Sequence, residues 1–568
     1  MEKTRQVMPR TLVSLSYRDI YDDYDTVDVH TILQGIPSVS VINYVTMLQA
    51  RVAYKSGNAY EQISIIREFL PYLSETIRRI VNAFIKHNKY HVCLIDAFTC
   101  FYTQALALQN FVPHESDDNE LDLCQDEFEP VFKAILYCNQ RWTDDQMDEI
   151  ADKNDLTEIS LRIDLPIIEF KYYKEVLPQL FKAIQFFRFA ESDPYYSTLL
   201  SFFYADNNVE DWKSYLLQII SFYFSSLKSP IVQIALKDSL ALFFFGQYSV
   251  NIADCRDLWS GSNSINYLRD HFLLKLSKNT FLLLNPNLLV DKIFQGLKFA
   301  FAETINKHSL PNKKGKPFNV RNLRLDFFSQ LGMDFSEPHL MYSLLQKIYV
   351  GHATQLFTGE FMKSEKIPDE PDFYLRIGEV LYLIEYKDLS LGDSIRYSHD
   401  YKNVIRPAIC ERICKYSEKS SKGFGQILNS IENIFSKGAM DTLDPDVQKV
   451  KTVVPLILTT DRTFSSLGVQ RILAEESEQI MRDYHIDKPI FITQPIVVDF
   501  DTLVICASKL HKGTLKLDVM IHEYLQKNRL YLSPFNAFVI DNCLRKSKIT
   551  KNDIQFMTEG LVELPYAT

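Results

Sequence analysis

The chain has 568 residues, which is more than one hydrophobic core normally organises, so about two or three domains are expected. Hydrophobic residues make up 46% of the sequence, enough to fill such cores. The formal net charge of −10 argues against a general nucleic-acid coat protein, although it allows a local basic groove, because binding depends on where charge lies.

Cysteine usage and hydropathy predict a protein of the reducing cytoplasm. The nine cysteines form no CxxC pair and are expected to be buried thiols. The first ten residues, MEKTRQVMPR, lack the apolar stretch of a secretion signal. The apolar run from Tyr215 to Leu227 is too short to cross a membrane, and the run from Ile231 to Val250 is interrupted by Lys237 and Asp238. Both are interpreted as buried helices, and no membrane contact is expected.

The first half of the sequence predicts helices. Apolar residues recur at helical spacing from Ser38 to about Leu108, and again from Tyr172 through Leu242. Glycines are few and strand alternation is not evident, so residues 1–305 are predicted to form an all-α domain. This half contains no fixed repeat, Walker-type glycine loop, nucleophile elbow or HExxH motif. Recognition of a partner, recognition of a substrate and self-association all stay open as its role.

A basic segment then interrupts the helical pattern. His308 to Asn322, HSLPNKKGKPFNVRN, contains two prolines, a glycine and several basic residues, so residues 306–336 are predicted to be a linker and domain edge. A solvated linker and an arm that contacts phosphates require the same composition, and both interpretations stay open. A helix is expected from Glu337 to Phe361, leading into the next segment.

Residues 371–388, PDFYLRIGEVLYLIEYKD, predict a tight β-hairpin. The branched and aromatic residues suit strands, and Gly378-Glu379 forms a two-residue turn whose first position accepts a positive φ. This turn pairs Ile377 with Val380, and stepping outward along the ladder sets Asp372 opposite Glu385. Because side chains alternate along a strand, Lys387 lies on the same face as these two carboxylates.

These three charged residues suggest a metal-dependent reaction. Opposed carboxylates raise each other's pKa unless a cation neutralises them, and oxygen ligands suit Mg²⁺, which keeps several waters. The lysine could orient or deprotonate a metal-bound water, or stabilise charge on a phosphate, as phosphodiester hydrolysis needs. The alternative is an ordinary edge hairpin, which predicts that Asp372 and Glu385 lie far apart or face open solvent.

Pro371-Asp372 followed by Glu385-Tyr386-Lys387 resembles the PD-(D/E)xK, or restriction-endonuclease-like, nuclease superfamily. The resemblance implies that Asp372, Glu385 and the backbone carbonyl of Tyr386 bind Mg²⁺ or Mn²⁺, and that Lys387 positions the attacking water. It also implies a supporting carboxylate on the preceding helix. Glu360 matches that place best, although Glu370 is closer in sequence.

The segments after the hairpin supply the rest of such a core. Residues 389–422 are an insertion, with basic residues that suit either a nucleic-acid backbone or a charged helix face. KSSKGFGQ then begins a helix on which Gln426 matches a glutamine common in the superfamily, and Lys419 and Lys422 are candidate nucleic-acid contacts, although capping alone explains this composition. Further predictions are a buried strand at Val453–Thr460, a helix at Ser466–Tyr484, strands at Pro489–Thr493 and Val497–Ala507, and a helix at Thr514–Lys527.

The sequence therefore predicts an all-α half followed by an α/β restriction-endonuclease-like domain with a mixed central sheet at residues 337–510, and a C-terminal cap at 511–568. The resemblance implies a nuclease, an endonuclease rather than an exonuclease, with DNA favoured over RNA. Fold-level analogy points to prokaryotic restriction or antiphage defence, with homo-oligomer or partner contacts through the helical half. The alternative function is a helical scaffold or adaptor whose nuclease-like domain binds nucleic acid without cutting it.

Overall fold

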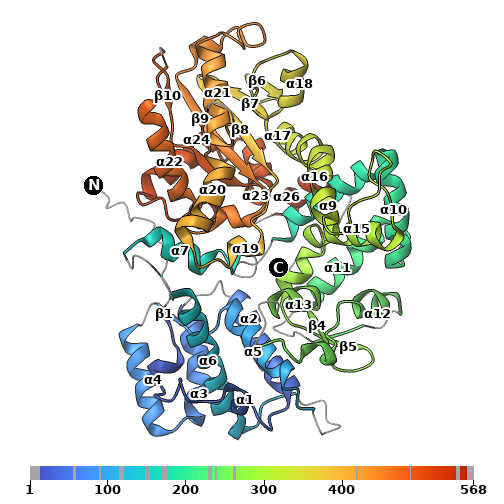
Figure 1. The fold of residues 1–568 in the computed structure, drawn as a ribbon, viewed down its shortest axis with the longest axis vertical. Coiled ribbons are helices and arrows are strands. Elements are labelled where there is room, and N and C mark those ends of the chain that lie inside the picture. Colours follow the sequence, from blue (N-terminus) through green and yellow to red (C-terminus); the bar gives the residue numbers. More distant parts are fainter. Residues whose placement is uncertain are drawn as a thin grey trace.

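The computed structural model describes residues 13–54, 59–88, 91–113, 121–147, 150, 154–168, 175–227, 233–236, 239–259, 264–417, 420–486, 488–544 and 550–559. Helices dominate the first half of the chain, and a mixed six-stranded sheet lies in the C-terminal part. In Figure 1 the N-terminal helices, coloured blue, lie at the opposite end of the molecule from most of this sheet, coloured yellow to red-orange. Among the described residues, no helix has the length and apolar character needed to cross a membrane.

The N-terminal helices pack as a bundle in which α5 contacts both α2 and α6. Their bounds are α1 (Val29–Ile32), α2 (Ser38–Tyr54), α3 (Ala59–Phe69), α4 (Glu75–His87), α5 (Ala97–Gln109) and α6 (Phe128–Met147). A short parallel pair, β1 (Val13–Ser14) and β2 (Val92–Cys93), lies beside them. Asn139 of α6 donates to the backbone carbonyls of Leu15 and Leu94, so one buried amide joins the strand pair to the bundle.

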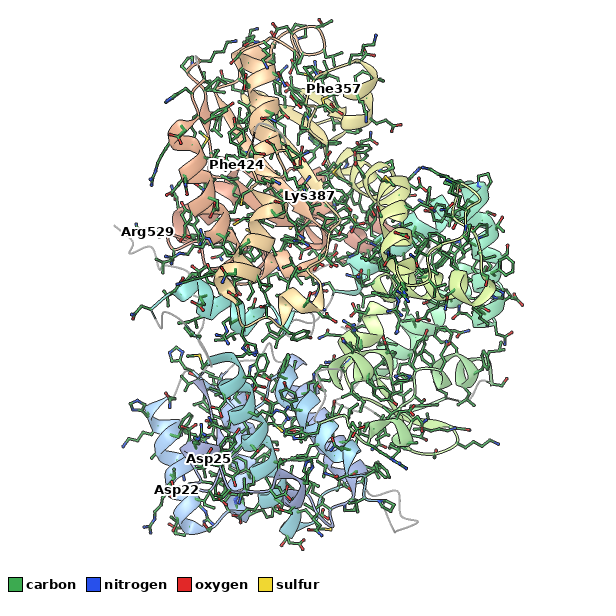
Figure 2. All side chains as sticks on the ribbon, in the orientation of Figure 1. Asp22, Asp25, Phe357, Lys387, Phe424 and Arg529 are labelled. Carbon is green, nitrogen blue, oxygen red and sulfur yellow. The ribbon has the colours of Figure 1, made fainter. Side chains whose placement is uncertain are left out.

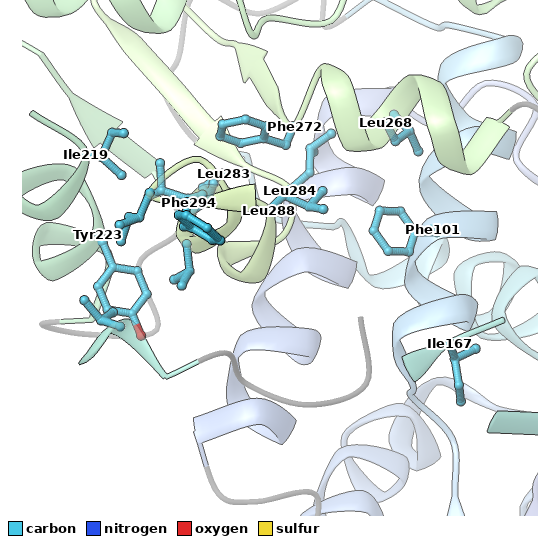
Figure 3. Close-up of a cluster of buried hydrophobic side chains, with 14 of the residues drawn as sticks. Phe101, Ile167, Ile219, Tyr223, Leu268, Phe272, Leu283, Leu284, Leu288 and Phe294 are labelled. Carbon is cyan, nitrogen blue, oxygen red and sulfur yellow. The ribbon is translucent and has the colours of Figure 1, made fainter. Parts of the chain in front are cut away.

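A second helical group follows and includes a small antiparallel sheet. Its helices are α9 (Val176–Ser192), α10 (Pro194–Asn207), α11 (Trp212–Leu227), α12 (Ser239–Gly246), α13 (Ser264–Asp270), α14 (Pro286–Asp291) and α15 (Gln295–His308). The sheet has the order β3 (Gln233–Ala235), β5 (Thr280–Leu283), β4 (Leu273–Lys275). Figure 3 shows Phe272, Leu283 and Leu284 from this sheet region packed near Phe101 of α5 and Ile219 of α11.

The prediction of an all-α first half is therefore wrong in detail, because the described residues of this half include five short strands between the helices. The predicted helix at 231–250 divides into β3 and α12 within the described residues. The strands β4 and β5 are joined by a tight turn in which Ser277 Oγ accepts from the backbone N–H of Thr280 at 3.2 Å. Most residues of both strands are apolar and buried, and hydrophobic periodicity cannot distinguish such short runs from part of a buried helix.

The large sheet has the order β6-β7-β8-β9, and β10 and β11 both pair with β9. The strands are β6 (Gln355–Thr358), β7 (Phe373–Ile377), β8 (Val380–Lys387), β9 (Thr452–Thr459), β10 (Phe491–Ile492) and β11 (Ile496–Asp499). Pairing from β6 to β8 is antiparallel, whereas β8, β10 and β11 run parallel to β9. The predicted mixed sheet is therefore present, and the carboxyl ends of β8, β9 and β11 meet at one edge.

Both faces of this sheet are covered. Phe373 and Leu375 of β7 belong to the large hydrophobic core that extends into the helical half. Leu381 and Leu383 of β8 face a second core, formed with α20 (Arg406–Ile413), α21 (Phe424–Phe435) and α22 (Val469–Asp483). The continuous apolar run of β8 fits a strand buried on both sides. Glu385 and Lys387 follow Leu381 and Leu383 on this same face of β8. Their side chains therefore lie under α21 and are not part of a solvated edge.

The helix α7 (Leu156–Asp164) lies within the predicted helical half but packs with the sheet. Leu161 and Leu165 belong to the second core, and Asp164 Oδ2 accepts from the backbone N–H of Leu467 at 2.9 Å. In Figure 1 this helix crosses between the blue bundle and the orange part of the chain. The helical half therefore contributes to a core of the sheet as well as to its own.

Two further predictions are corrected. The expected helix Glu337–Phe361 consists of part of a π-helix (Gly332–Met341), α17 (Tyr342–Tyr349), β6 and the start of α18 (Gly359–Ser364). The expected strand Val497–Ala507 ends at Asp499, whose carboxylate accepts from the Asp501 N–H and so begins α23 (Phe500–His511). The remaining helices are α16 (Leu323–Leu331), α19 (Asp393–Arg396), α24 (Leu517–Lys527), α25 (Phe535–Phe538) and α26 (Lys551–Thr558).

Candidate active site

The hairpin has the register that the sequence predicts. Ile377 pairs with Val380 around the turn, where Gly378 has a φ of +60°. At the open end Phe373 pairs with Ile384, and the carboxylate of Asp372 lies beyond this pair. Asp372 Oδ2 accepts from the backbone N–H of Tyr386 at 2.7 Å. The predicted juxtaposition of Asp372 with the second strand is therefore present.

Glu385 is fully buried at the centre of the site. Its side chain is 1% exposed, and Oε2 forms an ion pair with Lys387 Nζ at 3.0 Å. Its other oxygen, Oε1, is buried and has no hydrogen-bond partner among the described residues. A buried carboxylate oxygen without a hydrogen-bond partner is energetically unfavourable. A bound cation would remove this cost, so Oε1 is a candidate metal ligand that is shielded from solvent.

Lys387 is held by two contacts. Besides Glu385, its ammonium donates to Gln426 Oε1 at 2.9 Å. Gln426 lies in the first turn of α21, and the same Oε1 accepts from the backbone N–H of Gly423 at 3.0 Å. Figure 2 labels Lys387 within the sheet-containing part of the molecule. The predicted supporting residue Gln426 therefore touches the predicted catalytic lysine directly.

The pKa values of the three groups are shifted by burial and by one another. Burial raises the pKa of Glu385 well above its usual range, and the charge of Asp372 adds to this effect. Burial likewise raises the pKa of Asp372 to about 6, although Lys387 acts in the opposite direction. Burial alone would lower the pKa of Lys387, but Glu385 and Asp372 outweigh it and raise the pKa. The pair of carboxylates thus lacks sufficient positive charge from the protein alone.

Glu337 is the upstream carboxylate whose charge acts on all three groups of the site, and it is not one of the two that the sequence predicts. Its charge raises the pKa of Asp372, of Glu385 and of Lys387. Glu337 lies on the π-helix, where its Oε1 accepts from Tyr342 Oη at 2.6 Å. In the sequence this residue is marked only by the dipeptide Glu337-Pro338 before an apolar helical segment. The π-helical geometry that brings Glu337 near the hairpin has no recognisable sequence pattern.

The two predicted upstream carboxylates occupy other positions. Glu360 is exposed in the first turn of α18 and is not among the charges that shift Asp372 or Glu385. Glu370 raises the pKa of Asp372, but it does not act on Glu385 in the same way. The formation of β6 is the physical reason, because the chain leaves the helix before Glu360 and places that residue at the sheet edge.

The predicted phosphate contacts at the start of α21 are only partly available. Lys419 lies outside the described residues. Lys422 forms an ion pair with Glu411 at 2.9 Å, and the N–H of Gly423 is already used by Gln426. Other basic residues of the insertion are paired as well, since Arg406 contacts two acidic residues of α22. These contacts favour capping and ion pairing over phosphate binding at this helix end.

The basic segment after α15 forms a closed turn. Pro311 and Pro317 form an antiparallel bridge, and the backbone N–H of Asn312 donates to the Lys316 carbonyl at 2.8 Å. Lys313 is anchored to Asp193 at 2.9 Å. The side chains of Lys314 and Lys316 are exposed at the tip of this turn. The segment therefore has its own structure, and it retains exposed positive charge.

The donor atoms at the hairpin suit a small divalent cation that keeps waters. Among the described residues, no group of three or more His, Cys, Asp or Glu side chains is arranged to hold a metal ion. The candidate set instead combines two carboxylates, one of them with the unpartnered Oε1, and the backbone carbonyl of Tyr386. Mg²⁺ accepts such a set, because a few carboxylate or carbonyl oxygens and several waters complete its octahedron.

Comparison with known proteins gives no match for this chain among protein-family models, curated proteins or solved structures. The class of the site is therefore argued from its own residues.

Proposed function

We propose that this chain is a divalent-metal-dependent nuclease that hydrolyses nucleic-acid phosphodiester bonds. The observation that carries the proposal is the buried Glu385 next to Asp372, since one of its oxygens is paired to a lysine and the other has no hydrogen-bond partner in the part of the chain that the structure describes. Keeping two carboxylates this close without compensation is unfavourable, and a cation removes the penalty. The order of hairpin, covering helix α21 and parallel strand β9 is the one that the PD-(D/E)xK resemblance implies, and it supports the proposal of a restriction-endonuclease-like core.

Each residue has a distinct role in this proposal. Asp372 and Glu385 would hold Mg²⁺ or Mn²⁺ together with the Tyr386 carbonyl. When bound, the ion supplies a Lewis acid for the phosphate and lowers the pKa of a bound water. Lys387, held by Gln426, orients the attacking water and stabilises negative charge on the phosphate. Burial excludes bulk water around Glu385, which strengthens these electrostatic effects.

The proposed substrate is DNA in preference to RNA, in a prokaryotic restriction or defence setting. Incubating the purified chain with Mg²⁺ or Mn²⁺ and a panel of single- and double-stranded DNA and RNA tests the reaction and the substrate together. The expected result is cleavage that EDTA abolishes. Nucleic-acid binding without cleavage under every condition would instead support the alternative of a non-cleaving scaffold or adaptor.

The position of Glu337 leads to a prediction about the supporting carboxylate. Glu337→Gln is expected to weaken Mg²⁺ binding by about 10- to 100-fold, because it removes a negative charge that acts on both proposed ligands. Isothermal titration with Mg²⁺ measures this change. Glu360→Gln, in exposed α18, is the matched control and is expected to bind Mg²⁺ as the unmodified chain does. Equal effects of the two variants would contradict the role given to Glu337.

A further inference from the structure

A third acidic residue, Asp388, directly follows Lys387 at the end of β8 and faces away from solvent. Only 18% of its side chain is exposed. Ser336 Oγ donates to its Oδ2, and Thr460 Oγ1 donates to its Oδ1 at 2.5 Å. Lys298 Nζ lies 3.5 and 3.4 Å from the two carboxylate oxygens. Asp388 therefore has partners on both oxygens and does not need an ion.

These partners come from three separate parts of the chain. Thr460 directly follows β9, Ser336 lies on the π-helix immediately before Glu337, and Lys298 lies on α15 in the helical half. Asp388 itself adjoins Lys387. The carboxylate of Asp388 thus connects β8, which carries Glu385 and Lys387, to the π-helix that carries Glu337. Through Lys298 it also connects both elements to the helical half.

The π-helix needs such an external contact more than an α-helix does. Its wide turn is uncommon, and Pro338 within it lacks a backbone N–H to donate. The side chain of Glu337 is fixed on one side by Tyr342, which lies on the following helix α17. The Ser336 contact with Asp388 fixes the backbone of the same segment against β8. The same contact therefore restrains the distance between Glu337 and the hairpin carboxylates.

We propose that Asp388 is a positioning residue that fixes the π-helix against β8, and that Lys298 transmits the arrangement of the helical half to the site through it. The inference rests on the proposed function for its effect on metal binding. The contacts of Asp388 with Ser336, Thr460 and Lys298, which we call the Asp388 clamp, belong to the metal-free fold. Lys298 is 11% exposed and its ammonium has Asp388 as ion-pair partner, so a shift of α15 would move or unpair the carboxylate. This gives the helical half a physical means to regulate the site.

Asp388→Asn is the variant that tests this inference, because it keeps the side-chain shape and removes the charge. Its amide has an NH2 group in place of one carboxylate oxygen, so one of the two hydroxyls, Ser336 or Thr460, must accept instead of donate, and the ion pair with Lys298 is lost. We expect faster hydrogen–deuterium exchange in residues 332–341 of the metal-free protein. We also expect Mg²⁺ affinity to fall by about 10-fold, the lower end of the range for losing a group hydrogen-bonded to a metal ligand, because Asp388 acts through the π-helix that carries Glu337.

The matched control is Asp444→Asn. Asp444 is a fully buried carboxylate of the same sheet region, bound by Arg376 and Tyr374 at the far end of the hairpin. It should lower the melting temperature without changing exchange in residues 332–341 or Mg²⁺ affinity. Lys298→Met should act in the same direction as Asp388→Asn, and combining the two should give less than the sum of their effects.

Three results separate this inference from the proposed function. The role of the Asp388 clamp would be contradicted if hydrogen–deuterium exchange in residues 332–341 were unchanged in Asp388→Asn. It would also be contradicted if Asp444→Asn changed this exchange to the same extent. Faster exchange with unchanged Mg²⁺ affinity would overturn the positioning role and leave the nuclease proposal standing. Absence of both Mg²⁺ binding and cleavage in the unmodified chain would overturn the proposed function and the positioning role with it, whatever the exchange shows.

Discussion

Replacing Lys387 with alanine is expected to lower the rate of metal-dependent cleavage by about 10²- to 10⁴-fold, the usual range for losing a positioned proton-transfer group or a stabilising charge in an active site. The ammonium lies 3.0 Å from Glu385 and 2.9 Å from Gln426, so its direction is fixed before any substrate arrives. Single-turnover cleavage with enzyme in excess measures the change in the chemical step.

The fold should tolerate this change. Glu385 loses its cationic partner, but burial already raises the pKa of this carboxyl well above its usual range, so in the metal-free protein it can bind a proton in place of the ion pair. Lys451→Ala is the matched control, because Lys451 directly precedes β9 at the end far from Lys387, its side chain is 71% exposed, and it forms a surface ion pair with Glu379. Circular dichroism confirms folding of both variants. Undiminished cleavage by folded Lys387→Ala would remove Lys387 from the mechanism.

The hairpin could be predicted because its information is local. Gly378 accepts the positive φ of the turn, and this fixes the ladder from Ile377 to Phe373 residue by residue. The apolar run at β9 was predicted for the same reason, since a strand buried on both faces has a continuous hydrophobic sequence. Together these two segments determine where Asp372, Glu385 and Lys387 lie.

The supporting carboxylate could not be predicted because its position depends on packing. Glu337 and Glu360 both precede the hairpin, and a single continuous helix would have favoured Glu360. The helix instead ends at Tyr349 and the chain forms β6, which sends Glu360 to the surface. A short edge strand such as Gln355–Thr358 has too few residues for its alternation to be read, and a π-helix has no reliable sequence period.

The contacts between the helical half and the sheet could not be predicted from local sequence patterns either. Lys298 lies in helix α15 and has no distinctive neighbours in sequence, yet it reaches Asp388, which directly follows Lys387. Lys182 on α9 similarly pairs with Asp501 at 2.7 Å, just after β11. Such ion pairs between residues far apart in sequence show that the helical half and the sheet edge are physically joined, which supports regulation of the site by that half.

The metal-free protein is expected to lose stability as the pH rises through about 6. Burial raises the pKa of Asp372 from 3.8 to about 6, so the folded chain binds a proton that the unfolded chain has already released. A raised pKa contributes stability that is fully present below about pH 4 and disappears as the pH rises through the folded-state value. The shift corresponds to about 3 kcal/mol at 1.36 kcal/mol per pKa unit.

Asp372→Asn tests this relation and metal binding together. In EDTA at pH 8 the variant is expected to be more stable than the unmodified chain, by up to about 3 kcal/mol, because a neutral amide replaces a buried charge and can still accept from Tyr386. Mg²⁺ should raise the melting temperature of the unmodified chain more at pH 8 than at pH 5, and should not raise that of the variant. Urea unfolding in EDTA and thermal unfolding with Mg²⁺ measure the two effects.

Asp326→Asn, an exposed position on α16, provides the control for removing one negative charge and should leave both measurements unchanged. If Asp372→Asn were less stable in EDTA yet still stabilised by Mg²⁺, Asp372 would be a structural hydrogen-bond acceptor and the ion would bind elsewhere. A more stable variant that no longer responds to Mg²⁺ would show that the buried carboxylate opposes folding and binds the metal, as expected of a site kept for catalysis at some loss of stability.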